Sequence, residues 1–391
     1  MAILVALVVG LLVIPLFFYP FEYVRRVVFW AGADVDDYQK FPERKMEKSG
    51  SLFRFSAGFE ESKVRLGFHE AGRMDDLDRF LAANGTQAFI VIRDDKVLYE
   101  RYFNGARRDS IVTSFSVAKS FLSGLVGIAI AEGKIKGVEE PITRYLPELA
   151  DRDPRFSKIT LRHLLMISSG IRYAEFPFFH GDDAKTYYFP DLRRLALDET
   201  RIAGPPGLSF HYNNYHPLLL GLILERITRE KVAGYLEEKI WKPLGMEFPG
   251  SWSLDSVSSG FEKMESGINA RAIDFAKFGR LFLRKGDWGG KQVIPAHWVE
   301  ESTAEDPSLD RAAYYPKKGS FAALPDQYYK YFWWGMRRGG GKDDFFARGN
   351  HGQFIYAAPS KNLLIVRNGE RYGVPVENWI GMFYRFAGLL D

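Results

Sequence analysis

The segment from Thr113 to Gly133, TSFSVAKSFLSGLVGIAIAEG, constrains the fold more than any other part of the chain. Its second half is apolar on every side, which predicts a helix that is buried all round. The first turn nevertheless carries Ser116 and Lys119, and their three-residue spacing places both side chains on one helix face. A hydroxyl and an amine at the start of a buried helix are costly unless they are paired. The fold must therefore enclose this helix and give its first turn polar partners.

The Ser116–Lys119 pair is also suited to chemistry. A lysine amine that is shielded from water can take a proton from a neighbouring serine hydroxyl, which makes the serine a nucleophile. Free N–H groups at the helix N-terminus favour an oxyanion beside that serine. The spacing Ser-x-x-Lys is a weak motif by itself, and the alternative interpretation is a helix-capping serine beside a snorkelling lysine.

Composition excludes several classes of function. The 391 residues are 46% hydrophobic and 26% charged, as in folded globular proteins. The net charge of +4 is small and the basic pairs are scattered, so we expect no nucleic-acid binding. The absence of cysteine excludes disulfides and cysteine nucleophiles. The seven histidines show no zinc-binding spacing, so we expect neither a metal ion nor a cofactor.

The N-terminal segment predicts a membrane anchor. Residues Ala2 to Phe21 carry no charge, and twenty helical residues at ~1.5 Å each span ~30 Å, the thickness of a bilayer core. A basic leading region and a clear cleavage site are both absent, which favours an uncleaved single-pass anchor over residues 1–30 rather than a signal peptide. Arg25 and Arg26 after the span favour a cytoplasmic C-terminal side.

The rest of the chain divides into a linker over residues 31–70 and a catalytic domain over residues 71–391. A β-hairpin is predicted from Gln87 to Tyr102, and two β-rich runs are predicted between Phe345 and Asn368. Strands early and late with helices between them indicate one α/β (α+β) domain, with a helical lobe inserted over about residues 140–285.

Within that lobe, residues 171–191 are rich in aromatic and turn-forming residues and predict a long irregular loop over the pocket. A second candidate site follows the loop, in the segment Phe210 to Tyr215. Tyr212 and Asn214 are two residues apart and would point the same way in an extended segment. Tyr212 could carry a proton, and Asn214 could hold a substrate carbonyl or the lysine. The alternative is a buried tyrosine and a turn asparagine.

A third candidate is the segment 347–353, ARGNHGQ, just before a β-rich run. Its two glycines allow the backbone to approach closely, as a strand beside a substrate requires. The alternative is an ordinary β-turn or bulge.

The order of these three motifs resembles the serine β-lactamase and penicillin-binding protein superfamily. The branch whose sequence motifs are most similar contains class C β-lactamases, esterases, D-aminopeptidases and 6-aminohexanoate-dimer hydrolases. The resemblance runs from about Ala88 to Leu390, and it implies an antiparallel sheet flanked by helices with the helical lobe inserted. The matching phrases are SFSVAKSF (114–121), ITLRHLLMISSGI (159–171), GLSFHYNNYHPLLLGLILE (207–225), WKPLGM (241–246), SGINARAIDFAKFGRLFLRKGDWGGKQVIPAHW (266–298) and RGNHGQF (348–354).

The resemblance implies a role for each motif residue. Ser116 is the acylated nucleophile and Lys119 is its activating amine. Tyr212 matches the tyrosine that carries protons to the leaving group and from the deacylating water. Asn214 matches the asparagine that holds the substrate, and Tyr173 in the aromatic stretch is a further candidate substrate contact.

The third motif departs from the family pattern. The family's oxyanion hole combines the N–H of the serine with that of the residue after the motif glycine, here Gln353 after Gly352. β-Lactamases and penicillin-binding proteins have Lys-Thr-Gly at the motif, whereas this chain has Asn350, His351 and Gly352. The first position lacks a cation, although His351 or Arg348 could partly substitute. This departure favours an esterase or amidase over a β-lactam-recognising enzyme.

The resemblance therefore implies a serine hydrolase that cleaves an amide or ester bond of a small-molecule or peptide-like substrate through an acyl-enzyme on Ser116. The alternatives are a β-lactamase or DD-peptidase acting on cell-wall peptides, and a catalytically silent binding module of the same fold. Most relatives work outside the cytoplasm, which predicts a membrane-anchored, extracytoplasmic (periplasmic) catalytic domain, whereas Arg25 and Arg26 favour the opposite side.

Overall fold

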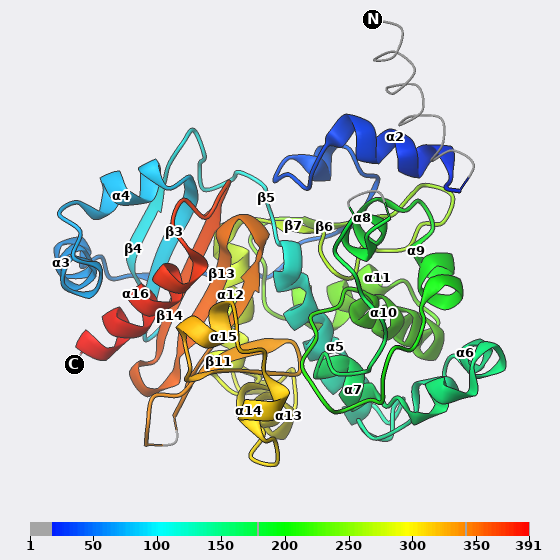
Figure 1. Ribbon diagram of the computed structural model, residues 1–391. Coiled ribbons are helices and arrows are strands. Elements are labelled where there is room, and N and C mark those ends of the chain that lie inside the picture. The colour runs from blue at the N-terminus through cyan, green and yellow to red at the C-terminus, as the bar shows by residue number, and fades with distance from the viewer. Residues whose placement is uncertain (1–17, 178–179, 341, 391) are drawn as a thin grey trace, which may run out of the picture.

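The computed structural model describes residues 18–177, 180–340 and 342–390. An eight-stranded sheet runs through the centre of one half of the molecule (Figure 1). Neighbouring strands are antiparallel except for the β2–β4 pair, which is parallel. In spatial order the strands are β10 (Gln327–Lys330), β11 (Trp333–Met336), β12 (Asp344–Gly349), β13 (Gln353–Ala358), β14 (Leu363–Gly369), β3 (Thr86–Arg93), β4 (Lys96–Tyr102) and β2 (Ser56–Ala57).

The sheet joins the two ends of the catalytic domain, as the sequence predicts. β3 pairs with β14, with Val91 opposite Ile365, so a strand near residue 90 lies beside one near residue 365. Every residue of β14 is buried, because helices cover both faces of the sheet. α3 (Glu61–Gly72) and α16 (Val376–Leu389) cover one face, and α12 (Ala272–Leu283) covers the other (Figure 1).

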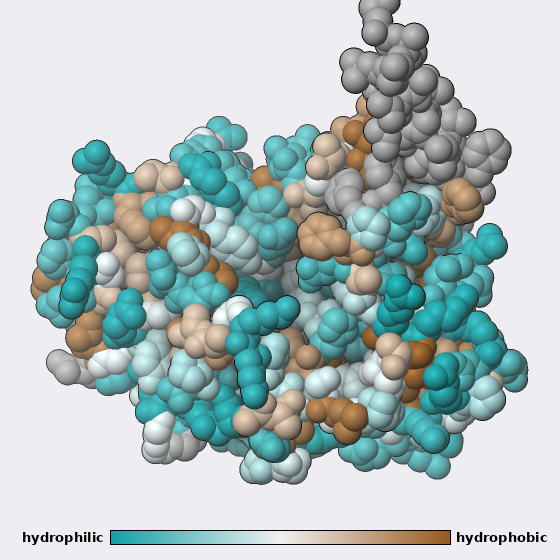
Figure 2. All heavy atoms as spheres, in the orientation of Figure 1, coloured by the Kyte–Doolittle hydropathy of each residue, from teal (hydrophilic) through white to brown (hydrophobic). Residues whose placement is uncertain are grey.

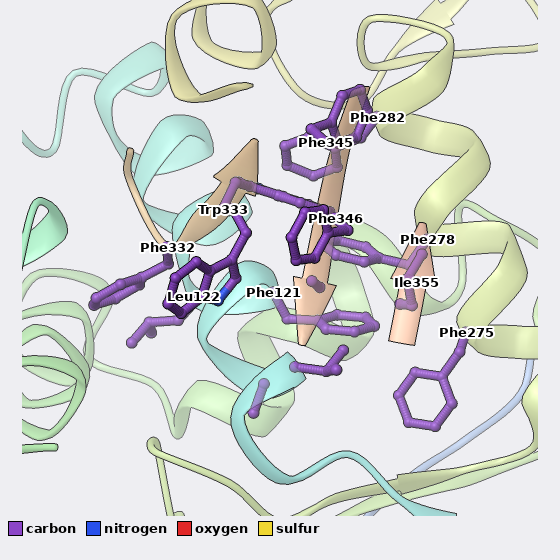
Figure 3. Close-up of a cluster of buried hydrophobic side chains, with 14 of the residues drawn as sticks. Phe121, Leu122, Phe275, Phe278, Phe282, Phe332, Trp333, Phe345, Phe346 and Ile355 are labelled. Carbon is purple, nitrogen blue, oxygen red and sulfur yellow. The ribbon is translucent and has the colours of Figure 1, made fainter. Parts of the chain in front are cut away.

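A second, four-stranded sheet leads into the central helix. Its order is β1 (Glu43–Met46), β6 (Gly250–Ser253), β7 (Ile268–Ala270) and β5 (Val112–Thr113). β5 continues through a 3₁₀ turn, η3 (Phe115–Val117), into α5 (Ala118–Ala131), which is buried over most of its length as its apolar sequence predicts. The Phe121 ring of α5 stacks on Phe278 of α12 at a centroid distance of 3.6 Å, within the aromatic cluster of Figure 3.

The helical lobe lies beside α5 and away from the large sheet (Figure 1). Residues 171–191, predicted to be an irregular loop, instead include a helix at 182–188. Two helices follow each other closely in residues 215–236, because Arg229 adopts the left-handed conformation with φ 60° and ends the first. The lobe contains α6 (Pro147–Arg152), α7 (Leu161–Leu165), α8 (Asp182–Tyr188), α9 (Leu192–Arg194), α10 (Tyr215–Thr228) and α11 (Val232–Leu236).

Outside the two sheets and the lobe, the other helices and short strands are α4 (Leu77–Ala83), β8 (Asp287–Trp288), β9 (Lys291–Gln292), α13 (Ala296–Thr303), α14 (Arg311–Tyr314) and α15 (Ser320–Ala323).

The predicted membrane anchor is not supported. Residues 1–17 lie outside the described residues, and the first described helix, α2 (Phe21–Trp30), has ten residues. Ten helical residues extend about 15 Å, roughly half of a bilayer core. Across residues 18–177, 180–340 and 342–390, no helix combines the length and apolar character needed to cross a membrane. This finding contradicts the prediction of a single-pass membrane protein with an extracytoplasmic catalytic domain.

α2 packs against α8 instead. The two helices share a small hydrophobic cluster that is separate from the main core, consisting of Tyr23, Val24, Val27, Phe41, Ala184 and Tyr188. The predicted linker also includes regular structure, because β1 pairs with β6, with Lys45 opposite Ser251.

Candidate active site

The position of Ser116 is set by the small sheet. The Ser114 N–H donates to the Ile268 carbonyl at 2.8 Å, and the Ile268 N–H donates to Ser114 Oγ at 3.0 Å, so the chain is fixed two residues before Ser116. Phe115 has φ 43°, in the left-handed region that non-glycine residues rarely adopt. Backbone strain of this kind persists only where the surrounding structure imposes it, and it is frequent at functional sites.

Lys119 is held inside the protein. Its side chain is 1% exposed, and Nζ donates to Ser116 Oγ at 2.9 Å and to the Glu265 carbonyl at 2.9 Å. The Tyr212 ring centroid is 5.1 Å from the same nitrogen. The structure thus brings the first two predicted motifs together, and the lysine does not snorkel to solvent.

Tyr212 lies half-buried at the edge of an aromatic cluster. Its ring is stacked over Trp334 of β11 at a centroid distance of 6.3 Å and an interplanar angle of 21°. The Arg348 guanidinium of β12 lies 4.0 Å from the centroid of the same Trp334 ring. The large sheet therefore fixes the orientation of Tyr212, although Tyr212 belongs to the helical lobe.

Asn214 and Tyr173 form one hydrogen-bonded group. Asn214 Nδ2 donates to the Tyr173 hydroxyl at 2.9 Å, and Tyr173 donates to Asp183 Oδ1 at 3.1 Å. Burial and the nearby Asp183 carboxylate raise the pKa of Tyr173 well above its usual value, so its hydroxyl stays protonated. Asn214 Oδ1 is buried and has no hydrogen-bond partner among the described residues. Tyr173 therefore lies behind Asn214 and orients it.

In the third motif, residues 347–353, it is the backbone rather than a side chain that comes close to the turn carrying Ser116. A Cβ on Gly349 would lie 2.3 Å from the Ser114 carbonyl, so only glycine allows β12 to pass this close to the turn that carries Ser116. The Gln353 side chain is buried, donating to the Gly369 carbonyl at 2.6 Å and accepting from Asn368 Nδ2 at 3.0 Å. The side chain of Gln353 is thus committed to the sheet, and only its backbone could contact a substrate.

His351 does not present its ring nitrogens to Ser116. Nδ1 lies 2.7 Å from the Glu370 carbonyl and Nε2 lies 2.9 Å from the Ala33 carbonyl. The neighbouring Gly352 has φ +84°, and a Cβ there would lie 1.9 Å from Arg367 Nη1. Both residues therefore shape the turn before β13, and the ring nitrogens of His351 are already occupied by backbone carbonyls.

A cavity of about 120 Å³ lies beside Ser116, where the surface is hollowed between the sheet and the helical lobe (Figure 2). Asp183, Asn214 and Glu265 are among its lining residues. Glu265 Oε1 is paired with Lys263 Nζ at 2.8 Å, whereas its Oε2 is buried without a hydrogen-bond partner among the described residues. Within the described part of the chain, no group of three or more His, Asp and Glu side chains is placed to hold a metal ion.

The sequence interpretation missed Glu265. Its carbonyl fixes Lys119 and its carboxylate lines the cavity, yet it stands immediately before the matching phrase that begins at Ser266. A backbone carbonyl carries no residue-type signal. Only the pairing of β7 with β5, which brings Glu265 next to α5, could have revealed it.

The fold and this group of side chains define the class of the protein, a serine hydrolase. The chain belongs to the Beta-lactamase family, whose family model matches residues 77–371. This confirms the superfamily predicted from the three motifs. It also agrees with the antiparallel, helix-flanked sheet of the structure.

Individual relatives and solved structures agree with this assignment. The 6-aminohexanoate-dimer hydrolase of Paenarthrobacter ureafaciens is 28% identical over 322 residues, which covers 80% of this chain and 79% of that protein. Esterase EstB of Burkholderia gladioli is 29% identical over 187 residues, covering 42% of this chain and 47% of that protein. A solved structure from Bacillus anthracis has a TM-score of 0.75 at 23% identity, covering 94% of this chain and 92% of that one. A class C beta-lactamase structure has a TM-score of 0.62 at 14% identity, covering 86% and 99%.

Proposed function

We propose that the enzyme cleaves a short amide or ester through an acyl-enzyme on Ser116. The observation that carries this proposal is the 2.9 Å contact between Lys119 Nζ and Ser116 Oγ, with the lysine fixed from behind by the Glu265 carbonyl. As Oγ bonds to the substrate carbonyl carbon, the Lys119 amine takes the hydroxyl proton. Tyr212, next to the lysine, donates a proton to the leaving group when the bond to it breaks.

Water then completes the cycle. It attacks the acyl carbon, gives its proton to the Tyr212–Lys119 pair, and releases the acid with the Ser116 hydroxyl restored. The N–H groups of Ser116 and Gln353 are proposed to stabilise the oxyanion in both steps, because the close approach of β12 to the Ser116 turn brings the start of β13 towards it.

The cavity wall favours an acyl group with a hydrogen-bond donor. Asn214 Oδ1 and Glu265 Oε2 are acceptors without partners among the described residues, and the Asp183 carboxylate is a third acceptor in the same wall. A wall that contains two carboxylates and an amide oxygen is electronegative, so it favours a ligand N–H or ammonium group, with the exposed Asp183 carboxylate as the accessible partner. We therefore propose an aminoacyl amide, in agreement with the name of the Paenarthrobacter relative. None of the described residues that line the cavity is Lys or Arg, which disfavours a carboxylate-bearing β-lactam or cell-wall peptide.

A pair of substrates tests this preference. We expect a 6-aminohexanoyl p-nitroanilide to be hydrolysed with a higher kcat/KM than the hexanoyl p-nitroanilide, which has the same chain without the amine. Asp183→Asn should reduce that preference by about fivefold or less, because an exposed ion pair contributes about 1 kcal/mol or less. Asp151→Asn, an exposed change on α6, is the matched control and should leave the preference unchanged. Equal turnover of both substrates by the wild-type enzyme would refute the aminoacyl preference.

A further inference from the structure

Residues 31–37, which we call the strap, border the catalytic cavity at Ala33. α2 ends where Ala31 adopts the left-handed conformation with φ 55°, and the chain then reaches Ala33 at the cavity. Ala33 of the strap lines the same cavity as Ser116, although the two residues are far apart in sequence. α2 and the strap lie above α8 and the small sheet (Figure 1). A segment predicted to be a linker is thus part of the catalytic pocket.

α2 is fixed to the helical lobe by a buried arginine. Arg26 is 3% exposed, and its Nη1 donates to the Asp255 carbonyl at 2.6 Å and to the Tyr188 carbonyl at 3.2 Å. Its Nε donates to Glu22 Oε1 at 2.9 Å, so the buried charge is paired within α2. A buried guanidinium with several acceptors holds a segment in place, because withdrawing it would leave those acceptors unsatisfied.

The strap itself is held on both sides of the cavity. On the lobe side, Asp37 is 1% exposed and accepts a hydrogen bond from the Tyr187 hydroxyl of α8 at 3.0 Å. The Asp34 N–H donates to the same carboxylate at 2.9 Å, which closes the strap on itself. On the sheet side, His351 Nε2 contacts the Ala33 carbonyl at 2.9 Å. The strap therefore bridges α8 and the turn before β13.

In the proposed mechanism, the cavity lies on the acyl side of the nucleophile. Tyr212, the proposed proton donor to the leaving group, is not among the residues that line it, whereas the strap, α8 and Glu265 are. Its volume of about 120 Å³ is well below the roughly 300–1,000 Å³ typical of pockets for drug-sized ligands. Whatever group lies beside Ser116 in this cavity must be small, and the strap is one of the walls that limit it.

We propose that the strap sets the length of the acyl group that the enzyme accepts, with Ala33 as the specificity-determining residue. This inference rests on the proposed acyl-enzyme function. Ala33 lines the cavity and has a small side chain, so enlarging that side chain shortens the accepted acyl chain. Asp37 anchors the strap to α8, so removing its carboxylate lets the wall retreat and lengthens the accepted chain.

The test uses the full chain and p-nitrophenyl esters from acetate to octanoate, which share one leaving group. Ala33→Leu should lower kcat/KM for hexanoate relative to acetate by at least tenfold. Asp37→Ala should raise kcat/KM for octanoate relative to acetate by at least fivefold. Asp36→Ala is the matched control, since its side chain is exposed and makes no capping hydrogen bond, and it should leave both ratios unchanged.

The outcomes separate the inference from the proposed function. If acetate is turned over but neither variant changes the chain-length ratios, the strap inference is overturned and the acyl-enzyme proposal stands. If the wild-type enzyme forms no acyl adduct with any ester, the proposed function fails and the strap inference fails with it. Should Asp37→Ala not fold, as circular dichroism would reveal, Ala33→Leu decides the question alone, because its position is only half-buried.

Discussion

Substituting two buried lysines separates an effect on catalysis from an effect on stability, because only one of them contacts Ser116. Lys119 is 1% exposed and contacts Ser116, whereas Lys277 is 0% exposed and pairs with Asp274 Oδ1 at 2.9 Å on α12. Lys119→Met removes the proposed general base, which contributes about 10²–10⁴-fold to the rate, or about 3–5 kcal/mol in the activation free energy. Its free energy of unfolding should fall by about 2 kcal/mol or less, the net value of two hydrogen bonds.

Lys277→Met should have the opposite pattern. It leaves the buried Asp274 carboxylate without its partner, and breaking a buried ion pair in this way costs about 3–5 kcal/mol of folding free energy. Its kcat on p-nitrophenyl acetate should stay near that of the wild type while the protein is folded. The assay is kcat for both variants beside denaturant unfolding followed by fluorescence. An Lys119→Met enzyme within tenfold of wild-type kcat, or an equal loss of kcat in both variants, would refute the role given to Lys119.

Two further predictions concern the fold. Burial lowers the pKa of His216 to about 3 from its usual value of about 6.5, so between these pH values the unfolded chain binds a proton that the native protein does not. The free energy of unfolding should therefore fall as the pH drops below about 6.5. At about pH 4.5 this loss should be about 3 kcal/mol smaller in His216→Gln than in the wild type. Urea unfolding at a series of pH values measures both. A Cβ on Gly127 would lie 2.3 Å from the Trp298 ring, so Gly127→Ala should cost about 1–3 kcal/mol and lower the thermal midpoint, whereas Gly137→Ala, with open space around its Cβ, should not. Equal midpoints for these two glycine variants would contradict the packing of α5.

The β3–β4 hairpin, the burial of α5 and the pairing of Ser116 with Lys119 were predictable from the local sequence. The hairpin of β3 and β4 follows from two β-rich runs around Asp94 and Asp95, and both aspartates adopt the left-handed conformation that such a turn needs. The burial of α5 follows from its apolar sequence, and the pairing of Ser116 with Lys119 follows from helical spacing. These features depend on residues that are close in the chain.

The features that were missed depend on contacts between distant segments. Arg26 was interpreted as a charge flanking a membrane span, but it is buried against carbonyl groups more than 150 residues away. α8 is too short to show a clear helical period, and it is stabilised by packing against α2. The carbonyl of Glu265 holds Lys119 and the carbonyl of Ala33 contacts His351, and a backbone carbonyl carries no residue-type signal in the sequence. Contacts between residues that are far apart in the chain cannot be recognised from the local sequence pattern.

The most direct test of the central claim is the intact mass of the acid-quenched full chain after mixing with p-nitrophenyl acetate, followed by peptide mapping. We predict that the wild-type protein gains the mass of one acetyl group on the peptide that contains Ser116, and that Ser116→Ala gains none and has no turnover. An acetyl group on another residue of the wild-type enzyme, or retained turnover by Ser116→Ala, would contradict the account.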